Sequence, residues 1–142
     1  MVAALCAACG DDPVDQDMID DEKVQAYLSA NNITATKDES GIYYSIEEEG
    51  TGDNPLESST VRVHYKGYLL CHLTFDQSNG VEPFETGLGS VIEGWRTGIP
   101  LFKKGTVGKL FIPSRLAYGP SGTFGIAPNT VLIFDIELVG FF

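Results

Sequence analysis

The sequence predicts a single domain of the α+β class, in which one short helix covers an antiparallel sheet. A length of 142 residues fits one domain, and a content of 43% hydrophobic and 11% aromatic residues is enough for a hydrophobic core. From residue 41 onward, strand periodicity dominates, and only one stretch between the strands is long enough for a helix. Length, composition and periodicity together therefore indicate a sheet-based fold.

The first nine residues resemble the end of a truncated bacterial lipoprotein signal peptide. In MVAALCAAC, small apolar residues lead to Cys9, in the position of the cysteine that becomes the lipidated first residue of such proteins. Cys6 stands where these signals usually carry leucine, and their basic segment is missing. The alternative is a disordered N-terminus with incidental cysteines. We expect lipidation at Cys9 and a protein of the bacterial cell envelope, lipid-anchored and facing the periplasm.

Acidic side chains are concentrated in the first sixty residues, which hold fourteen Asp or Glu and two Lys in a chain of net charge −11. Residues 10–19 are acidic and are expected to form a solvated tether. The rest of the chain is near neutral and has no basic stripe, which argues against nucleic acid as a partner. No segment approaches the roughly 20 apolar residues of a membrane span, so membrane contact is expected only through the lipid.

The N-terminal extension, residues 20–40, is expected to contain one short helix over residues 20–32. Val24, Tyr27 and Leu28 are spaced to share one helix face. Acidic residues at the start favour a helix N-terminus, and the asparagine pair at the end is typical of a stop.

Four segments with alternating apolar side chains predict the strands of the sheet, and they are Gly41–Glu49, Val61–Leu70, Thr106–Pro113 and Val131–Val139. Residues 50–55, GTGDNP, form a turn cluster after the first of them. The segment Ile92–Leu101 is the covering helix, which Gly98 and Pro100 limit to a few turns. Ala117–Asn129 is rich in glycine and proline and is expected to be a shaped loop.

Residue patterns typical of nucleophilic, dinucleotide or metal sites are missing from the sequence. There is no GxSxG, and GLGS at residues 87–90 is too short for a dinucleotide fingerprint. His64 lies in a predicted strand and is interpreted as structural. Asp76, Glu82 and Glu85 lie close together but without histidines, which favours a solvated loop over a metal site. We therefore expect neither a metal nor another cofactor.

The cysteines do not form a pattern that predicts zinc or a disulfide framework. With Cys6 and Cys9 assigned to the leader, Cys71 is expected to be an unpaired, small apolar residue that is buried or half-buried.

Aromatic residues gather at the ends of the predicted elements, next to glycines. Trp95, the single tryptophan, is flanked by Gly94 and Gly98. Each aromatic taken alone fits a core position. Taken together with their neighbours, they form six blocks that resemble, in the same order, the FKBP-type peptidyl-prolyl cis–trans isomerases: VHYKG, TFDQS, PFETGLG, VIEGW, LAYGPSG and IFDIEL. The resemblance runs from about Gly41 to Phe142.

The resemblance implies a twisted antiparallel half-barrel sheet wrapped around one short helix over residues 41–142, with an apolar pocket between them. It places Trp95 at the floor of this pocket. The implied catalytic residues are Tyr65, Phe75, Asp76, Trp95, Tyr118 and Phe134. The implied substrate-binding residues are Phe84, Val91, Ile92 and Ile126. Among these, the Ile92 backbone N–H and the Tyr118 hydroxyl are implied as hydrogen-bond donors to carbonyls of a ligand.

The function implied by the resemblance is acceleration of X-Pro bond rotation in proline-containing polypeptides, without a cofactor. Combined with the expected envelope location, it implies help in the folding of exported proteins. Macrolides of the rapamycin type are implied as further ligands. Two alternatives stay open: a non-catalytic chaperone module that binds proline-containing segments in the envelope, and a structural envelope lipoprotein whose pocket is vestigial.

Overall fold

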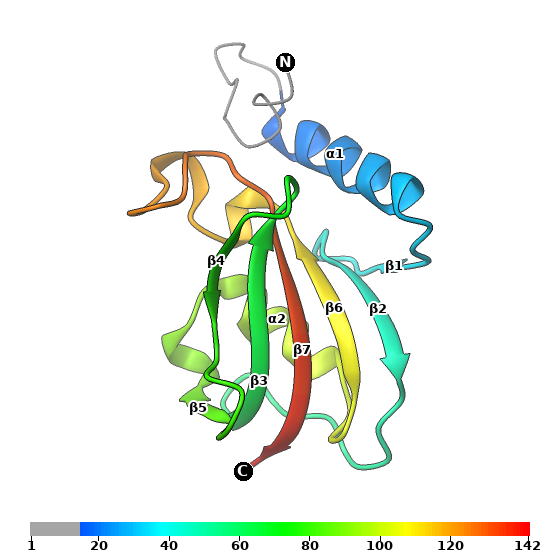
Figure 1. Ribbon diagram of the computed structural model, residues 1–142, viewed down its shortest axis with the longest axis vertical. Helices are drawn as coiled ribbons and strands as arrows, with labels where there is room; N and C mark the ends of the chain where they lie inside the picture. Colours follow the sequence, from blue (N-terminus) through cyan, green and yellow to red (C-terminus); the bar gives the residue numbers. More distant parts are fainter. Residues whose placement is uncertain (1–14) are drawn as a thin grey trace.

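A computed structural model describes residues 15–142, so the proposed leader, Cys9 and most of the tether lie outside the described residues. The strands are β1 (Thr36–Lys37), β2 (Tyr43–Glu48), β3 (Thr60–Leu69), β4 (Thr74–Gln77), β5 (Phe84–Gly87), β6 (Val107–Ile112) and β7 (Leu132–Phe141). The helices are α1 (Gln16–Ala30), α2 (Glu93–Gly98) and the 3₁₀ turns η2 (Leu88–Ser90), η3 (Ile99–Leu101), η4 (Ser114–Leu116) and η5 (Gly119–Ser121). The predicted α+β class is confirmed (Figure 1).

The strands form one antiparallel sheet in the order β1-β2-β6-β7-β3-β4, and β5 also pairs with β3. At its centre β3 pairs with β7, from Val61 opposite Phe141 to Leu69 opposite Leu132. Strands β4 and β5 pair with opposite ends of β3 on its other side. The chain between β3 and β5 therefore follows one edge of the sheet, where several of the predicted site residues lie.

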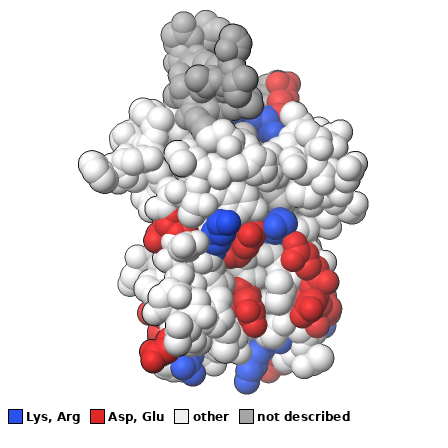
Figure 2. Space-filling model, in the orientation of Figure 1, with Lys and Arg blue, Asp and Glu red and all other residues white. Residues whose placement is uncertain are grey.

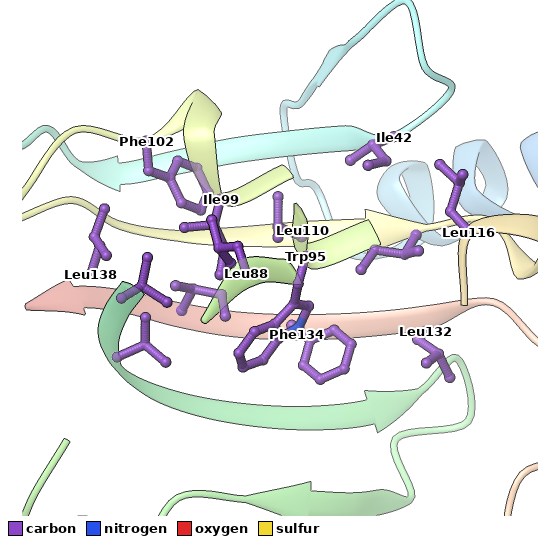
Figure 3. Packing of buried hydrophobic residues seen from close by; sticks show 14 of the residues in the cluster. Ile42, Leu88, Trp95, Ile99, Phe102, Leu110, Leu116, Leu132, Phe134 and Leu138 are labelled. Atoms are coloured by element: carbon purple, nitrogen blue, oxygen red, sulfur yellow. The ribbon is translucent and has the colours of Figure 1, made fainter. Parts of the chain in front are cut away.

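The helix α2 lies across one face of the sheet, and the main hydrophobic core fills the space between them (Figures 1 and 3). Its fully buried members include Leu88, Ile99, Phe102, Leu110, Leu132 and Leu138. Gly94 lets α2 approach β6, because a Cβ at this position would lie 2.5 Å from Cγ2 of Ile112. The close packing of helix on sheet thus depends on a residue without a side chain.

The N-terminal helix α1 packs on the sheet through a second, smaller core. Val24 and Leu28 are buried and Tyr27 packs against them, so the predicted apolar stripe is confirmed. Their partners in this second core are Tyr43, Tyr68, Phe111, Val131 and Ile133. The extension is therefore part of the folded body.

The helix α1 begins at Gln16, earlier than the predicted start at residue 20. Asp15 is the N-cap residue, and its side chain accepts a hydrogen bond from the backbone N–H of Asp17 at 3.0 Å. Residues 16–19, which were assigned to the tether, are therefore the first turn of the helix.

The turn between β3 and β4 contains Cys71 and His72. His72 has a φ angle of +73°, in the left-handed region. Cys71 is disulfide-bonded, so the expectation of an unpaired apolar cysteine is wrong. The prediction was wrong because it assigned Cys6 and Cys9 to the leader, which left no cysteine to pair with Cys71.

Within residues 15–142, no helix combines the length and apolar composition needed to cross a bilayer.

Candidate active site

Trp95 forms the floor of a cavity between α2 and the sheet. The carbonyl of Ile92, the residue before α2, accepts hydrogen bonds from the backbone N–H groups of Trp95 (3.0 Å) and Arg96 (3.2 Å), which fixes the start of the helix. The indole is only 4% exposed. It meets the rings of Tyr65 and Phe134 edge-on, with centroid separations of 5.1 and 5.3 Å. Figure 3 shows Trp95 next to Phe134. Edge-to-face contacts of this kind favour a rigid arrangement of rings.

A second pair of rings extends the aromatic wall. Phe75 of β4 and Phe134 of β7 meet edge-on at 5.6 Å, above Gly67 of β3. A Cβ at Gly67 would lie 2.7 Å from the rings of both phenylalanines. The glycine of the VHYKG block therefore allows the two rings to meet above the strand.

The cavity has a volume of about 520 Å³, which lies within the range of small-ligand sites. It is lined by Tyr65, Phe75, Asp76, Phe84, Ser90, Val91, Ile92, Trp95, Ala117, Tyr118 and Phe134. Phe84 and Tyr118 are 41% and 38% exposed. The buried rings thus form the floor and walls, while these two rings remain available to a ligand that enters.

One hydrogen bond orders the polar side of the cavity. The hydroxyl of Tyr65 donates to Oδ2 of Asp76 at 2.9 Å, and the other carboxylate oxygen accepts from the backbone N–H of Gln77 at 2.9 Å. Burial, followed by the neighbouring Asp76 carboxylate, raises the pKa of Tyr65 to about 12. Tyr65 is therefore neutral at physiological pH, and its ring is held in place by the acid at the rim.

The structure brings together nine of the ten predicted site residues around this cavity. Ile126 is the exception, because it is 7% exposed, belongs to the main core and does not line the cavity. The loop pairs Thr123 with Ile126 in an isolated bridge, which accompanies this inward placement. Sequence reasoning missed Ser90 and Ala117, which line the cavity but are small and carry no aromatic signal.

The chemistry available at this cavity is that of apolar surface with a few hydrogen-bonding groups. Its only carboxylate, Asp76, is already engaged by Tyr65 and a backbone N–H. His64 lies next to Tyr65 on β3 but does not line the cavity. Across residues 15–142 there is no group of three or more His, Cys, Asp or Glu side chains arranged to hold a metal ion. The arrangement suits the binding of a compact apolar ring.

Comparison with known proteins places most of this fold in one family. Residues 52–139 match the family model described as FKBP-type peptidyl-prolyl cis-trans isomerase. The FKBP-type isomerase FkpA of Aeromonas hydrophila is 40% identical over 131 residues, which cover 88% of this chain and 48% of that protein. FkpA of Escherichia coli strain K12 is 46% identical over 100 residues, or 70% of this chain and 37% of that protein. The chain thus spans about half or less of the length of these curated relatives.

Two solved structures share the same architecture. The crystal structure of FkpA from Escherichia coli matches with a TM-score of 0.76 and 38% identity, over 88% of this chain and 60% of that one. The peptidyl-prolyl cis-trans isomerase of Pseudomonas syringae pv. tomato matches with a TM-score of 0.75 and 30% identity, over 93% of this chain and 98% of that one. These matches agree with the predicted sheet wrapped around a short helix. With its aromatic cavity inside the matched region, the chain belongs to the FKBP-type peptidyl-prolyl cis–trans isomerase family.

Proposed function

We propose that this chain is a peptidyl-prolyl cis–trans isomerase that accelerates rotation about X-Pro bonds in the cavity above Trp95. The observation that carries the proposal is the indole floor, which Tyr65 and Phe134 enclose edge-on. The floor is flat and apolar, and the cavity of about 520 Å³ has room for a proline ring and its neighbours. Membership of the isomerase family supports the same activity.

Isomerisation of this bond needs no general acid or base. Rotation about an amide has a barrier of roughly 18–20 kcal/mol because resonance is lost at the twisted geometry. X-Pro bonds populate both isomers and exchange over roughly tens to hundreds of seconds. The twisted amide has less charge separation than the planar one, so an apolar cavity favours it over the ground state. Each difference of roughly 1.4 kcal/mol in this preference raises the rate tenfold.

Two hydrogen-bond donors at the cavity are suited to orient the substrate. Tyr118 and Ile92 both line the cavity, and Tyr118 is 38% exposed. We expect the Ile92 backbone N–H and the Tyr118 hydroxyl to donate to the carbonyls on either side of the proline. Asp76 acts indirectly, because its carboxylate holds the Tyr65 ring through the hydroxyl.

The substrates are proline-containing polypeptides, and we place their isomerisation in the bacterial cell envelope during the folding of exported proteins. Support for this location comes from the small-residue segment that precedes Cys9. A lipid on Cys9 would anchor the domain to a membrane. Lipidation of Cys9 and an intrachain disulfide of Cys71 exclude one another, because a sulfur that carries a lipid thioether cannot form a disulfide and cleavage before Cys9 removes Cys6.

A protease-coupled assay on several short X-Pro peptides tests the proposed activity. The folded protein should accelerate the slow phase of cleavage in proportion to its concentration. A protein that suppresses aggregation of an unfolded, proline-rich client but accelerates none of the peptides would be a chaperone module instead. A protein that does neither would have a vestigial pocket.

A further inference from the structure

The helix α1 is hydrogen-bonded directly to the segment that forms one wall of the cavity. Asp20 of α1 is fully buried, and its Oδ2 accepts hydrogen bonds from the backbone N–H of Ser114 at 2.8 Å and from the Ser114 hydroxyl at 2.5 Å. Its Oδ1 accepts from the side-chain amide of Gln16 at 2.8 Å. Both oxygens of this buried carboxylate are therefore engaged.

Ser114 starts the turn η4, which leads straight into the cavity wall. The carbonyl of Ser114 accepts from the backbone N–H of Ala117 at 2.9 Å, and Ala117 and Tyr118 both line the cavity. The carbonyl of Tyr118 in turn accepts from Gly122 at 3.0 Å. Hydrogen bonds and the backbone of η4 thus connect Asp20 to the wall, and we expect a displacement of Ser114 to move the wall.

A second, weaker contact lies beside the first. The guanidinium of Arg115 is 3.2 Å from the carboxylate of Asp17 and also donates to the carbonyl of Ser40. Exposed ion pairs of this kind contribute little to stability. The buried bonds between Asp20 and Ser114 are therefore the main link between α1 and the loop that carries the wall, which lie at the same end of the sheet (Figure 1).

We propose that α1 positions the wall formed by Ala117 and Tyr118 through Asp20, which makes Asp20 a positioning residue for isomerisation. Without the Asp20 carboxylate, the N–H and O–H groups of Ser114 would be buried without acceptors, which is unfavourable. We expect η4 to move toward water in that case and to widen the cavity. The proposal rests on the proposed function, since it names a residue that supports the same site.

The chain offers a set of matched variants. Asp20→Ala removes the carboxylate oxygen that accepts both Ser114 bonds, whereas Asp20→Asn keeps one oxygen that can accept both of them. Asp21→Ala is the control, because Asp21 lies next to Asp20 on α1 but bonds to Tyr43 and Lys37, away from the cavity. Each variant changes one acidic side chain of the same helix.

The Michaelis constant for an X-Pro peptide is the informative kinetic readout. A variant that is partly unfolded has a lower apparent kcat at constant KM, because the folded molecules still bind normally. A displaced wall instead weakens binding, so we expect Asp20→Ala to raise KM about fivefold. Asp20→Asn and Asp21→Ala should keep the wild-type KM.

Hydrogen–deuterium exchange tests the positioning without relying on activity. In Asp20→Ala the backbone amides of Ala117 and Gly122 should exchange roughly tenfold faster than in wild type, since their hydrogen bonds loosen. The amide of Leu138, which bonds to Thr106 in the central sheet, should not change. An inactive wild-type protein would contradict the proposed function, while the exchange rates would still decide the positioning.

Two results would overturn the proposal. One is an Asp20→Ala variant with the KM and the exchange rates of wild type. The other is an equal rise of KM in Asp20→Ala and Asp21→Ala, which would mean that α1 acts only through its general docking. Should Asp20→Ala fail to fold, Ser114→Ala provides the test. It removes only the hydroxyl bond, and it should raise KM by a smaller factor with faster exchange at Ala117.

Discussion

Trp95 owes its position to side chains that are far apart in the sequence. Tyr65 comes from β3, Phe134 from β7 and Phe75 from β4, and their rings enclose the indole or extend its wall. Because the chain has a single tryptophan, any change at the cavity floor is reported by one fluorophore. The fluorescence of Trp95 can therefore report ligand binding at the surface that Trp95 itself forms.

Macrolides of the rapamycin type should bind at this floor, and binding should change the emission of Trp95. An apolar ring placed against the indole excludes water from its exposed edge and changes its surroundings. Fluorescence titration measures the effect, and calorimetry under the same conditions measures binding independently. Calorimetric saturation without any change in emission would show that the ligand binds away from Trp95.

The burial of Tyr65, followed by its hydrogen bond to Asp76, raises its pKa and predicts a stability change at high pH. The pKa of Tyr65 in the folded protein is raised from 10.0 to about 12, so the folded state holds the phenol proton that the unfolded state has lost. This contribution to stability is complete below about pH 10 and is lost as the pH rises toward 12. We therefore expect the free energy of unfolding to fall less steeply with pH in Tyr65→Phe than in wild type. Urea titrations at several pH values measure both slopes, and parallel curves would contradict the assignment.

The elements of the sheet differ in how far the sequence predicts them. The four long strands alternate over enough residues to be recognised, and β2, β3, β6 and β7 confirm them. The strands β1, β4 and β5 have two to four residues, too few for a period, and they form because β2 and β3 offer free edges. The helix α1 starts earlier than predicted because Asp15 is its N-cap residue. The sequence did not indicate this start, since Asp15 lies in an acidic segment that is typical of a tether.

The residues of the candidate site likewise differ in how far the sequence predicts them. Its aromatic residues could be predicted because each stands in a block that resembles the family. Ser90 and Ala117 could not, because a small side chain becomes part of a wall only through the path of its loop. The inward position of Ile126 likewise depends on the bridge to Thr123, which the sequence of a loop rich in glycine does not specify.

The packing of α2 on β6 predicts the effect of a single methyl group. In Gly94→Ala the added Cβ would lie 2.5 Å from Ile112, so the core must shift to accommodate it. Overpacking of this kind should lower the free energy of unfolding by about 1–3 kcal/mol. Gly89→Ala is the matched control, since a Cβ there meets no atom within 4 Å and should leave stability nearly unchanged. Chemical denaturation measures both variants, and equal stabilities would contradict the close contact.

The charge of the whole molecule is distributed unevenly between the N-terminal part and the folded body. Figure 2 shows acidic and basic side chains interspersed on the face turned toward the viewer. Oppositely charged side chains also pair on the sheet, where Lys109 lies 2.8 Å from Asp135 and 3.5 Å from Glu47. The face shown in Figure 2 has no continuous basic surface among its described residues. The net negative charge of the chain comes from its first sixty residues, which hold fourteen Asp or Glu and two Lys.

Location in the envelope is tested at the scale of the whole protein by the lipidation site. In the natural precursor, Cys9→Ser should move the protein from the membrane fraction to the soluble fraction, because the sulfur that would carry the lipid is lost. Cys6→Ser is the control and should remain with the membrane. If the unmutated precursor is already soluble after fractionation, lipid anchoring is wrong, and the proposed isomerase activity is unaffected.

The central claim is that the cavity above Trp95 catalyses rotation about X-Pro bonds, and two-dimensional NMR exchange spectroscopy on an X-Pro peptide observes that rotation directly. Catalytic amounts of the folded protein should accelerate cis–trans exchange by far more than tenfold over the free peptide, and Tyr65→Ala should reduce that acceleration roughly tenfold or more. His64→Ala is the control, because neighbouring residues of β3 point to opposite faces of the sheet, and it should retain the wild-type rate. Exchange at the uncatalysed rate in the presence of folded wild-type protein, or equal acceleration by Tyr65→Ala, would contradict the account.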